Sequence, residues 1–555
     1  MNSPNPALVT ERAAKRLPRP VLLLFCAAYV LPGLFGRDPW KSADASAFGY
    51  MINIAQGRTP WLDPTVGGLP GDAALLPYWL GAIFIKALSP AVDPMLAARL
   101  PFALLLVLVL VFTWYCTYHL ARTEAAQPLP FAFGGEASPI DYARAIADGA
   151  LLALIATLGL LQLGHETTPE LAQLTATALF LYALAACPYR DTPARFAVLV
   201  ALPALAASGA PAIALGLGIG GVIVCRASAY EQARALAPWV ALSAVLSLVA
   251  AFALRAWGWR VAGYDSFAQV LGLLRQLVWF TWPAWPLALW TLWRWRDHLL
   301  HRHISIPLVC AGVGLAACLG MGGSDRALML TLPALAVLVA FALPTLQRST
   351  AAAIDWFSVF FFSVCAIAIW VVYVSMQTGV PRQPAANVAR LAPGFVPSFS
   401  AFALIMAGAG TVAWLWLVQW RTGRNRHPLW KSMVLPASGV ALCWLLLMTL
   451  WLPMLDYARS YRPLIVKLVP MLPKAGCVAA PGVSRAQVAA LEDLGGYRVD
   501  AVTPARSTRC GVLLQIESRK RPVAAPAGWR RTGQANRPTD RDEVTAVYTR
   551  VSAGS

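Results

Sequence analysis

Long runs of apolar residues, separated by short polar segments, fill most of the chain between Pro20 and Pro453. A helix needs about 20 apolar residues to cross the hydrocarbon core of a bilayer. This pattern predicts membrane-spanning helices at 20–36, 98–118, 146–164, 171–187, 196–208, 210–225, 236–254, 282–293, 305–322, 327–346, 354–375, 398–420 and 432–453. We therefore predict an all-α polytopic membrane protein with about thirteen transmembrane helices.

Three basic clusters orient these helices, at 12–19, 294–302 and 421–431. Lysine and arginine near helix ends mark the cytoplasmic side of a membrane. Placing all three clusters inside predicts a cytoplasmic N-terminus, residues 1–19, and a C-terminus on the outer face. No small-residue cleavage motif follows the first apolar run, so we expect that run to remain as the first helix.

The first outer loop, residues 37–97, is too long for a simple turn, and loops longer than about 15 residues are usually functional or internally structured. It contains an amphipathic stretch at 48–55 and an apolar segment at 75–85. The second is too short to span, and its Tyr78 and Trp79 suit the headgroup level, so we expect an interfacial helix. The loop is predicted to be periplasmic and to belong to a transmembrane domain at 20–453.

The tail, residues 454–555, changes composition and alternates short strand-like and helix-like segments, which predicts a small periplasmic α/β domain. Ser484 and Gln487 form a capping box that opens a helix ending at Gly495. Cys477 and Cys510 lie near two expected strands. In an oxidising compartment they would form a disulfide, and the alternative is two buried thiols.

Composition supports a membrane protein, since 58% of the residues are hydrophobic and only 13% are charged. The formal net charge of +19 is not a sign of nucleic-acid binding, because much of it lies in short loops where it orients helices, and no nucleic-acid-binding motif is present. The ten cysteines include no CxxC or zinc-type spacing.

Ionisable residues at membrane depth are costly and often functional. The threading places ten on the outer face: Asp38, Asp44, Asp63, Asp72, Arg99, His165, Glu166, Glu170, Asp265 and Arg326. Arginine forks suit phosphate, and paired carboxylates can hold a divalent cation. This pattern predicts an anionic ligand, although each residue has a structural alternative. Asp44, for example, could be a helix N-cap.

Six short motifs occur along the chain in this order: Asp44, Trp61-Leu-Asp-Pro64, Pro77-Tyr78-Trp79, Ala98-Arg99-Leu-Pro101, Thr168-Pro-Glu170 and Asp325-Arg326. This order resembles the GT-C membrane glycosyltransferases, above all the lipid A aminoarabinose transferases and the protein O-mannosyltransferases. Three positions depart from the family pattern. Ala45 replaces the second acid of a pair, Ala73 stands where the family has a lysine that contacts donor phosphate, and Glu170 replaces an aspartate.

The resemblance implies a bacterial inner-membrane enzyme with a sugar donor on undecaprenyl phosphate, working within the lipid bilayer. The acceptor would be an envelope glycolipid such as lipid A, a glycan or a protein, with no nucleic acid involved. It implies that Asp44 is a general base acting on the acceptor, and that Arg99 and Arg326 bind the donor phosphate.

The same resemblance implies a divalent cation held by Asp72 and Glu170. Further substrate contacts are expected from Asp38, His165, Tyr78 and Trp79. Two other functions fit the sequence. A lipid or solute transporter would use the charged outer face as a gate, and a catalytically inactive scaffold of an envelope assembly would explain Ala73.

Overall fold

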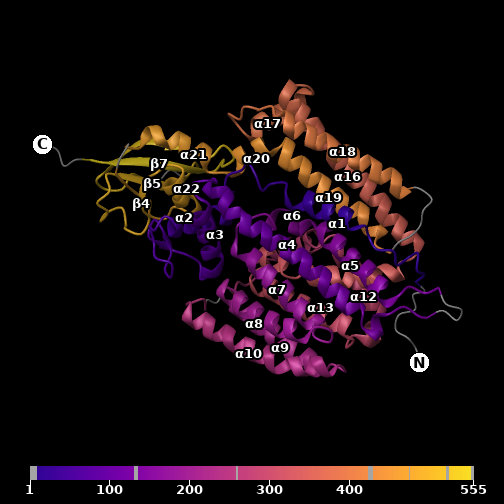
Figure 1. Cartoon of the computed structure of the whole chain (residues 1–555). Coiled ribbons are helices and arrows are strands. Elements are labelled where there is room, and N and C mark those ends of the chain that lie inside the picture. The colour runs from indigo at the N-terminus through magenta and orange to yellow at the C-terminus, as the bar shows by residue number, and fades with distance from the viewer. Residues whose placement is uncertain are drawn as a thin grey trace.

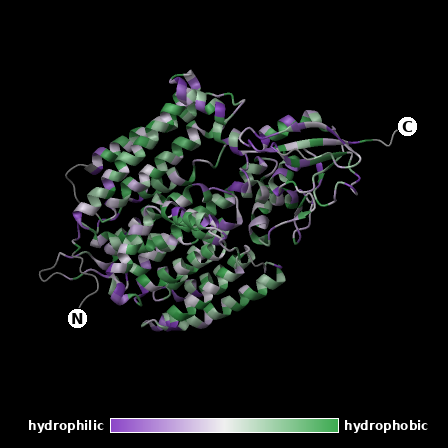
Figure 2. Ribbon diagram, turned by 180° about the vertical axis from the view of Figure 1, so that it is seen from behind, coloured by the Kyte–Doolittle hydropathy of each residue, from purple (hydrophilic) through white to green (hydrophobic). Residues whose placement is uncertain are grey.

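The computed structural model describes residues 9–130, 135–257, 261–422, 429–473, 476–520 and 524–551. A large helical part is joined to a small sheet domain (Figure 1). The helical part is dominated by hydrophobic residues, whereas the sheet domain carries more hydrophilic ones (Figure 2).

Every segment predicted to span the membrane contains a helix. These helices are α1 (Arg19–Val30), α4 (Pro94–Ala121), α5 (Pro139–Ala156), α6 (Leu158–Leu163), α7 (Pro169–Ala186), α8 (Asp191–Ala207), α9 (Pro211–Arg226), α10 (Glu231–Ala253), α12 (Ala284–Arg294), α13 (Arg302–Gly320), α14 (Asp325–Met329), α15 (Leu332–Ala342), α16 (Arg348–Thr378), α18 (Ala401–Thr422) and α19 (Lys431–Leu450). Six helices in the described ranges are long and apolar enough to cross a bilayer: α4, α10, α13, α16, α18 and α19. The chain is a multi-pass membrane protein, and the number of thirteen spans stays a prediction.

Local sequence explains where these helices begin and break. Asp93 caps α4, because its carboxylate accepts hydrogen bonds from the backbone N–H groups of Met95 and Leu96 at 3.0 and 3.2 Å. The predicted segment 327–346 is divided into α14 and α15, and Pro333 lies in the first turn of α15, where proline is favoured. Two helices that we did not predict, α11 (Phe267–Phe280) and α17 (Arg382–Leu391), lie between spans.

The helices differ in how deeply they lie within the protein. In the most apolar stretch of α19, 78% of the residues are buried within the protein, against 11% in α18. The helix α19 is therefore central, whereas α18 leaves large apolar side chains such as Phe402 and Trp416 exposed. In a membrane protein such side chains face lipid.

The first loop is structured, as predicted. It contains α2 (Ala43–Ala55), a short antiparallel hairpin of β1 (Thr65–Val66) and β2 (Leu69–Pro70), and α3 (Leu75–Leu88). The C-terminal part begins with α20 (Leu452–Arg459) and α21 (Arg462–Leu468). It continues with β3 (Cys477–Ala479), α22 (Arg485–Asp493), β4 (Arg498–Asp500), β5 (Val512–Ser518), β6 (Trp529–Ala535) and β7 (Glu543–Arg550).

The five strands of the C-terminal domain form one sheet in the order β4-β3-β5-β7-β6. Strand β3 is parallel to β4 and β5, whereas β7 is antiparallel to both of its neighbours. Cys477 and Cys510 are joined by a disulfide, with their Cα atoms 4.9 Å apart. Ser484 caps α22 by accepting a hydrogen bond from the backbone N–H of Gln487.

The sheet domain packs on the first loop (Figure 1). Helices α2 and α22 approach so closely that a Cβ atom on Gly49 would lie 2.4 Å from the Cβ of Ala489. Glu492 accepts hydrogen bonds from the Asn53 side chain and the Gly67 backbone, at 2.8 and 3.0 Å. The C-terminal domain therefore fixes the position of α2, the helix that carries Asp44.

Candidate functional site

Asp44 lies in the first turn of α2 and is 1% exposed. One carboxylate oxygen accepts hydrogen bonds from the backbone N–H and the hydroxyl of Thr167, at 2.8 and 2.5 Å. The other accepts from the backbone N–H of Trp40 at 3.0 Å and from the Arg37 guanidinium at 3.1 Å. Ser42, not Asp44, precedes the helix at the N-cap position.

These contacts determine the charge of Asp44. Burial favours the neutral acid, but the guanidinium groups of Arg37 and Arg99 and the hydrogen bonds from Thr167 and Trp40 outweigh it and lower the pKa. A carboxylate offers about four acceptor positions, and all of them are engaged here. In this conformation Thr167, Trp40 and Arg37 occupy these acceptor positions. The role of Asp44 as general base stays a prediction.

Arg37 connects the end of α1 to the opposite side of the site. Its guanidinium donates to the carbonyl of Gly33 at 2.9 Å, to Asp44 at 3.1 Å and to the carbonyl of His165 at 2.6 Å. It also lies 4.7 Å from the ring centroid of Trp40. Sequence reasoning gave Arg37 no role, although its place directly after the first apolar run was a usable signal.

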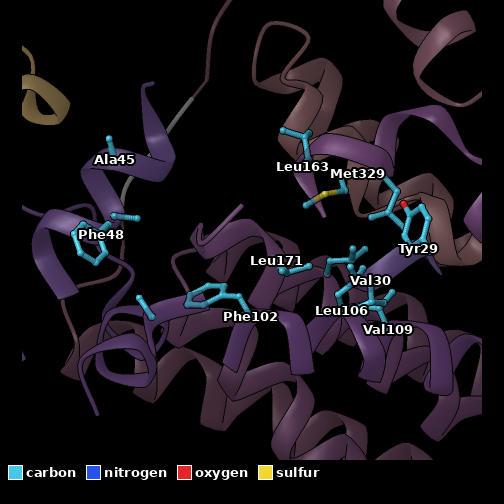
Figure 3. Close-up of a cluster of buried hydrophobic side chains, with 14 of the residues drawn as sticks. Tyr29, Val30, Ala45, Phe48, Phe102, Leu106, Val109, Leu163, Leu171 and Met329 are labelled. Atoms are coloured by element: carbon cyan, nitrogen blue, oxygen red, sulfur yellow. The ribbon is translucent and has the colours of Figure 1, made fainter. Parts of the chain in front are cut away.

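Arg99, on α4, is 4% exposed, and its Nη2 atom has no hydrogen-bond partner among the described residues. It lines a small cavity between α1, α4 and the α6–α7 loop. The other lining residues are Val30, Gly33, Leu34, Phe102, Ala103, Leu106, Gly164, His165 and Thr167. Figure 3 shows three of them, Val30, Phe102 and Leu106, within the buried hydrophobic cluster. One buried cation thus faces mostly apolar walls.

Arg326, predicted to share the donor phosphate with Arg99, is instead paired with acids of the α6–α7 loop and α7. It donates to Glu166 at 2.6 Å, to Glu170 at 3.2 Å and to the Thr168 hydroxyl at 3.0 Å. It does not line the Arg99 cavity. Burial and the nearby Asp44 carboxylate raise the pKa of Glu166 despite this ion pair.

Asp38 links the first loop to the C-terminal part. Its two carboxylate oxygens accept hydrogen bonds from the Arg462 guanidinium at 2.7 and 2.6 Å. Its backbone N–H donates to Asp456 at 2.9 Å, and Asp456 also accepts from the Trp40 indole at 3.1 Å. Asp38 is 6% exposed and bridges the first loop to α21, and it also lines a small cavity with Phe48 and Tyr461. Its role as a substrate contact stays a prediction.

His165 lines the Arg99 cavity, as a substrate contact should. Both ring nitrogens lie near backbone carbonyl oxygens, of Leu161 at 2.7 Å and of Tyr29 at 2.8 Å. Burial lowers the pKa of His165 to about 4, although the two carbonyl oxygens oppose this effect. The ring is therefore neutral at neutral pH and fixed in orientation.

Tyr78 and Trp79 hold the first loop together. Tyr78 is buried against Tyr50, with ring centroids 5.1 Å apart. The Trp79 indole N–H donates to the carbonyl of Trp61 at 2.7 Å. Both aromatic residues thus stabilise the first loop, and their contact with a substrate stays a prediction.

The predicted cation site does not form in this structure. Asp72 is paired with Arg485 of α22 at 3.0 Å, whereas Glu170 is paired with Arg326. The two carboxylates thus face different arginines, and Glu170 shares Arg326 with Glu166. The described residues contain no group of three or more histidine, cysteine or acidic side chains placed to hold a metal ion. The residues present therefore do not fit the cation that the resemblance implied.

Two solved structures match this fold over nearly their whole length. They are ArnT from Cupriavidus metallidurans in the apo state and the same protein bound to undecaprenyl phosphate. The match covers 95% of this chain in both cases, and 98% and 96% of those chains, with TM-scores of 0.59 and 0.57 and 14% sequence identity.

No family model and no curated protein matches the sequence. At 14% identity the structural likeness concerns the fold alone. This chain therefore has the fold of ArnT, a lipid A aminoarabinose transferase of the GT-C type, as the order of its motifs predicted.

Proposed function

We propose that this protein is a glycosyltransferase of the bacterial inner membrane, which transfers a sugar from a polyprenyl-phosphate donor to an envelope acceptor. The reaction takes place on the periplasmic face, at the Arg99 cavity beneath the C-terminal domain. The observation that carries this proposal is the unpaired Nη2 of Arg99 in an apolar cavity.

An arginine inside a protein needs an anion, because leaving a buried charge uncompensated is strongly unfavourable. Asp44 is the acid that acts most strongly on the charge of Arg99, and its acceptor positions are already occupied by other donors. A phosphate group suits the planar guanidinium fork and would supply the missing acceptor. The apolar walls around Arg99 suit the first isoprene units of a lipid carrier.

The structural neighbour bound to undecaprenyl phosphate supports a lipid carrier of this kind. In the proposed reaction the bond between the anomeric carbon and the phosphate oxygen breaks as the acceptor oxygen forms a new bond to that carbon. Polyprenyl phosphate leaves with the electron pair, and Arg99 stabilises its growing charge. Asp44 holds Arg37 and Thr167 in place around the cavity.

The state of Asp44 bears on the acceptor. A hydroxyl acceptor needs a base, and all acceptor positions of Asp44 are taken. An acceptor oxygen that is already ionised, such as that of a phosphate group, needs none. We therefore favour a phosphate-bearing glycolipid as acceptor, over a glycan or a protein hydroxyl.

The test is transfer of radiolabelled sugar from a panel of undecaprenyl-phosphate sugars to envelope extract, by the purified wild-type protein and by Arg99→Gln. A matched control is Arg234→Gln, an exposed arginine at the start of α10. Transfer by the wild type and the control, but not by Arg99→Gln, is expected. Folded wild-type protein that transfers no sugar from any donor would favour the scaffold, and movement of lipid across vesicles without a new glycosidic bond would favour the transporter.

A further inference from the structure

A second group of cations lies at the other end of α4. Arg122 follows α4 directly, 23 residues after Arg99, which corresponds to about 35 Å along the helix. Arg302 opens α13 and belongs to the basic cluster that the charge rule places on the cytoplasmic side. This group is therefore separate from the candidate active site.

Aromatic rings, not carboxylates, surround these cations. The guanidinium of Arg122 lies 4.1 Å from the ring centroid of Tyr189 and 5.5 Å from that of Tyr118. Tyr189 also stacks on His119, with centroids 5.6 Å apart. Arg190, the next residue, is exposed and lies near enough to His119 to act on its charge.

Two buried side chains of this group, Arg302 and His119, each have a nitrogen without a hydrogen-bond partner among the described residues. Arg302 is 6% exposed and donates to the Ser228 hydroxyl and the Leu184 carbonyl, yet its Nε has no partner. His119 is 4% exposed, and its Nδ1 also has none. Within the described ranges neither Arg122, Arg190 nor Arg302 forms an ion pair with an acid. Arg122 and Arg302 both act on Tyr189, and Arg122 and Arg190 both act on His119. The three arginines thus share these neighbours without an ion pair to an acid in the described part of the chain.

An apolar track leads along α4 to this group. Its exposed side chains are Leu104, Val107, Val111 and Tyr115, three or four residues apart and therefore on one face of the helix. Tyr118 and Arg122 continue the same spacing. An acyl chain could lie on this face with its headgroup at Arg122, whereas a free anion would make no use of the track.

We propose that Arg122, Arg190, Arg302 and Tyr189 form a binding site for the phosphate headgroup of an anionic phospholipid of the cytoplasmic leaflet. Basic pockets between helices on this side of a membrane bind such headgroups. Arginines at helix C-termini also neutralise the helix dipole, and the Leu184 carbonyl gives Arg302 that role. Neutralisation of the helix dipole would not depend on the lipid present. An experiment that varies the lipid therefore distinguishes it from headgroup binding.

The experiment measures lipid retention by native mass spectrometry on delipidated full-length protein, with phosphatidylglycerol and phosphatidylcholine of the same acyl chains. Phosphatidylglycerol should be retained in preference, and Arg122→Gln with Arg190→Gln should weaken that retention by about tenfold or more. Arg234→Gln is the control variant and should retain phosphatidylglycerol as the wild type does. Arg190→Gln alone is included in case the double variant misfolds, because the exposed Arg190 side chain makes no hydrogen bond to the described residues.

Three outcomes would overturn the proposal. One is equal retention of both lipids by the wild type, and another is retention unchanged in the Arg190→Gln and double variants. The third is competition by millimolar inorganic phosphate that removes the lipid preference, which would make the group a site for free phosphate.

Discussion

The guanidinium of Arg462 and the carboxylate of Asp38 form a two-bond ion pair, at 2.7 and 2.6 Å, between the C-terminal part and the first loop. Asp38 is buried, whereas the Arg462 side chain is 54% exposed. The pair therefore holds the first loop to a residue 424 positions away in the sequence.

We expect Asp38→Asn and Arg462→Gln each to lower sugar transfer, and the double variant to lose less than the sum. Because one partner is exposed, a coupling free energy of roughly 0.5–1 kcal/mol is expected from a double-mutant cycle on transfer rates. Strictly additive losses would show that the pair makes no contribution as a pair.

Arg99 and Arg326 should respond in opposite ways to removal of their charge. Arg99→Gln removes an unpaired buried cation, so the melting temperature should stay the same or rise while kcat/KM falls by about 100-fold or more. Arg326→Gln leaves Glu166 and Glu170 without their ion-pair partner, so it should lower the free energy of unfolding by about 2–3 kcal/mol. Thermal unfolding followed by fluorescence measures both. A large loss of stability in Arg99→Gln would indicate a structural partner for Arg99.

Asp493, in α22, makes stability depend on pH. Burial and the nearby Asp93 raise its pKa to about 6, although Arg58 and Arg462 oppose them. The folded protein thus holds a proton that the unfolded chain has lost between about pH 4 and pH 6, and stability falls as pH rises through that window. Asp493→Asn should remove this dependence and raise the melting temperature at pH 7.5 relative to wild type. An unchanged difference between pH 5 and pH 7.5 in the variant would contradict the assignment.

The disulfide between Cys477 and Cys510 closes a loop of 33 residues. On the chain-entropy model a cross-link of this size stabilises the C-terminal domain by about 3–4 kcal/mol. Replacing both cysteines with serine should therefore lower the melting temperature and increase proteolysis within 476–551. Reduction of the wild type should reproduce this effect, and reduction of the double-serine variant should do nothing more.

The helices were predictable because each depends on its own stretch of sequence. An apolar run such as 432–453 specifies a helix wherever it lies, and Ser484 caps α22 through a residue three positions away. Helix α11 was missed because Gln269, Arg275 and Gln276 interrupt its apolar residues. It forms between spans as an amphipathic helix, not as a membrane-crossing one.

The pairing of the site residues was not predictable, because it depends on contacts between distant segments. Asp44 meets Thr167 across 123 residues and Arg326 meets Glu166 across 160. The sequence predicted these arginines and acids only as a group, without their partners. Arg99, and not Arg326, is the arginine left without an acidic partner. This follows only from the packing of α4 against α1 and the α6–α7 loop.

The contact between Glu492 and Asn53 also has a consequence for biosynthesis. These two residues are 439 positions apart, so the ribosome has made nearly the whole chain before Glu492 exists. Until α22 has been synthesised, α2 lacks the surface on which it packs, and the position of Asp44 is not fixed. The surroundings of Asp44 are therefore completed late in synthesis, and a chain released early by the ribosome would contain its apolar helices without the domain that holds α2 in place.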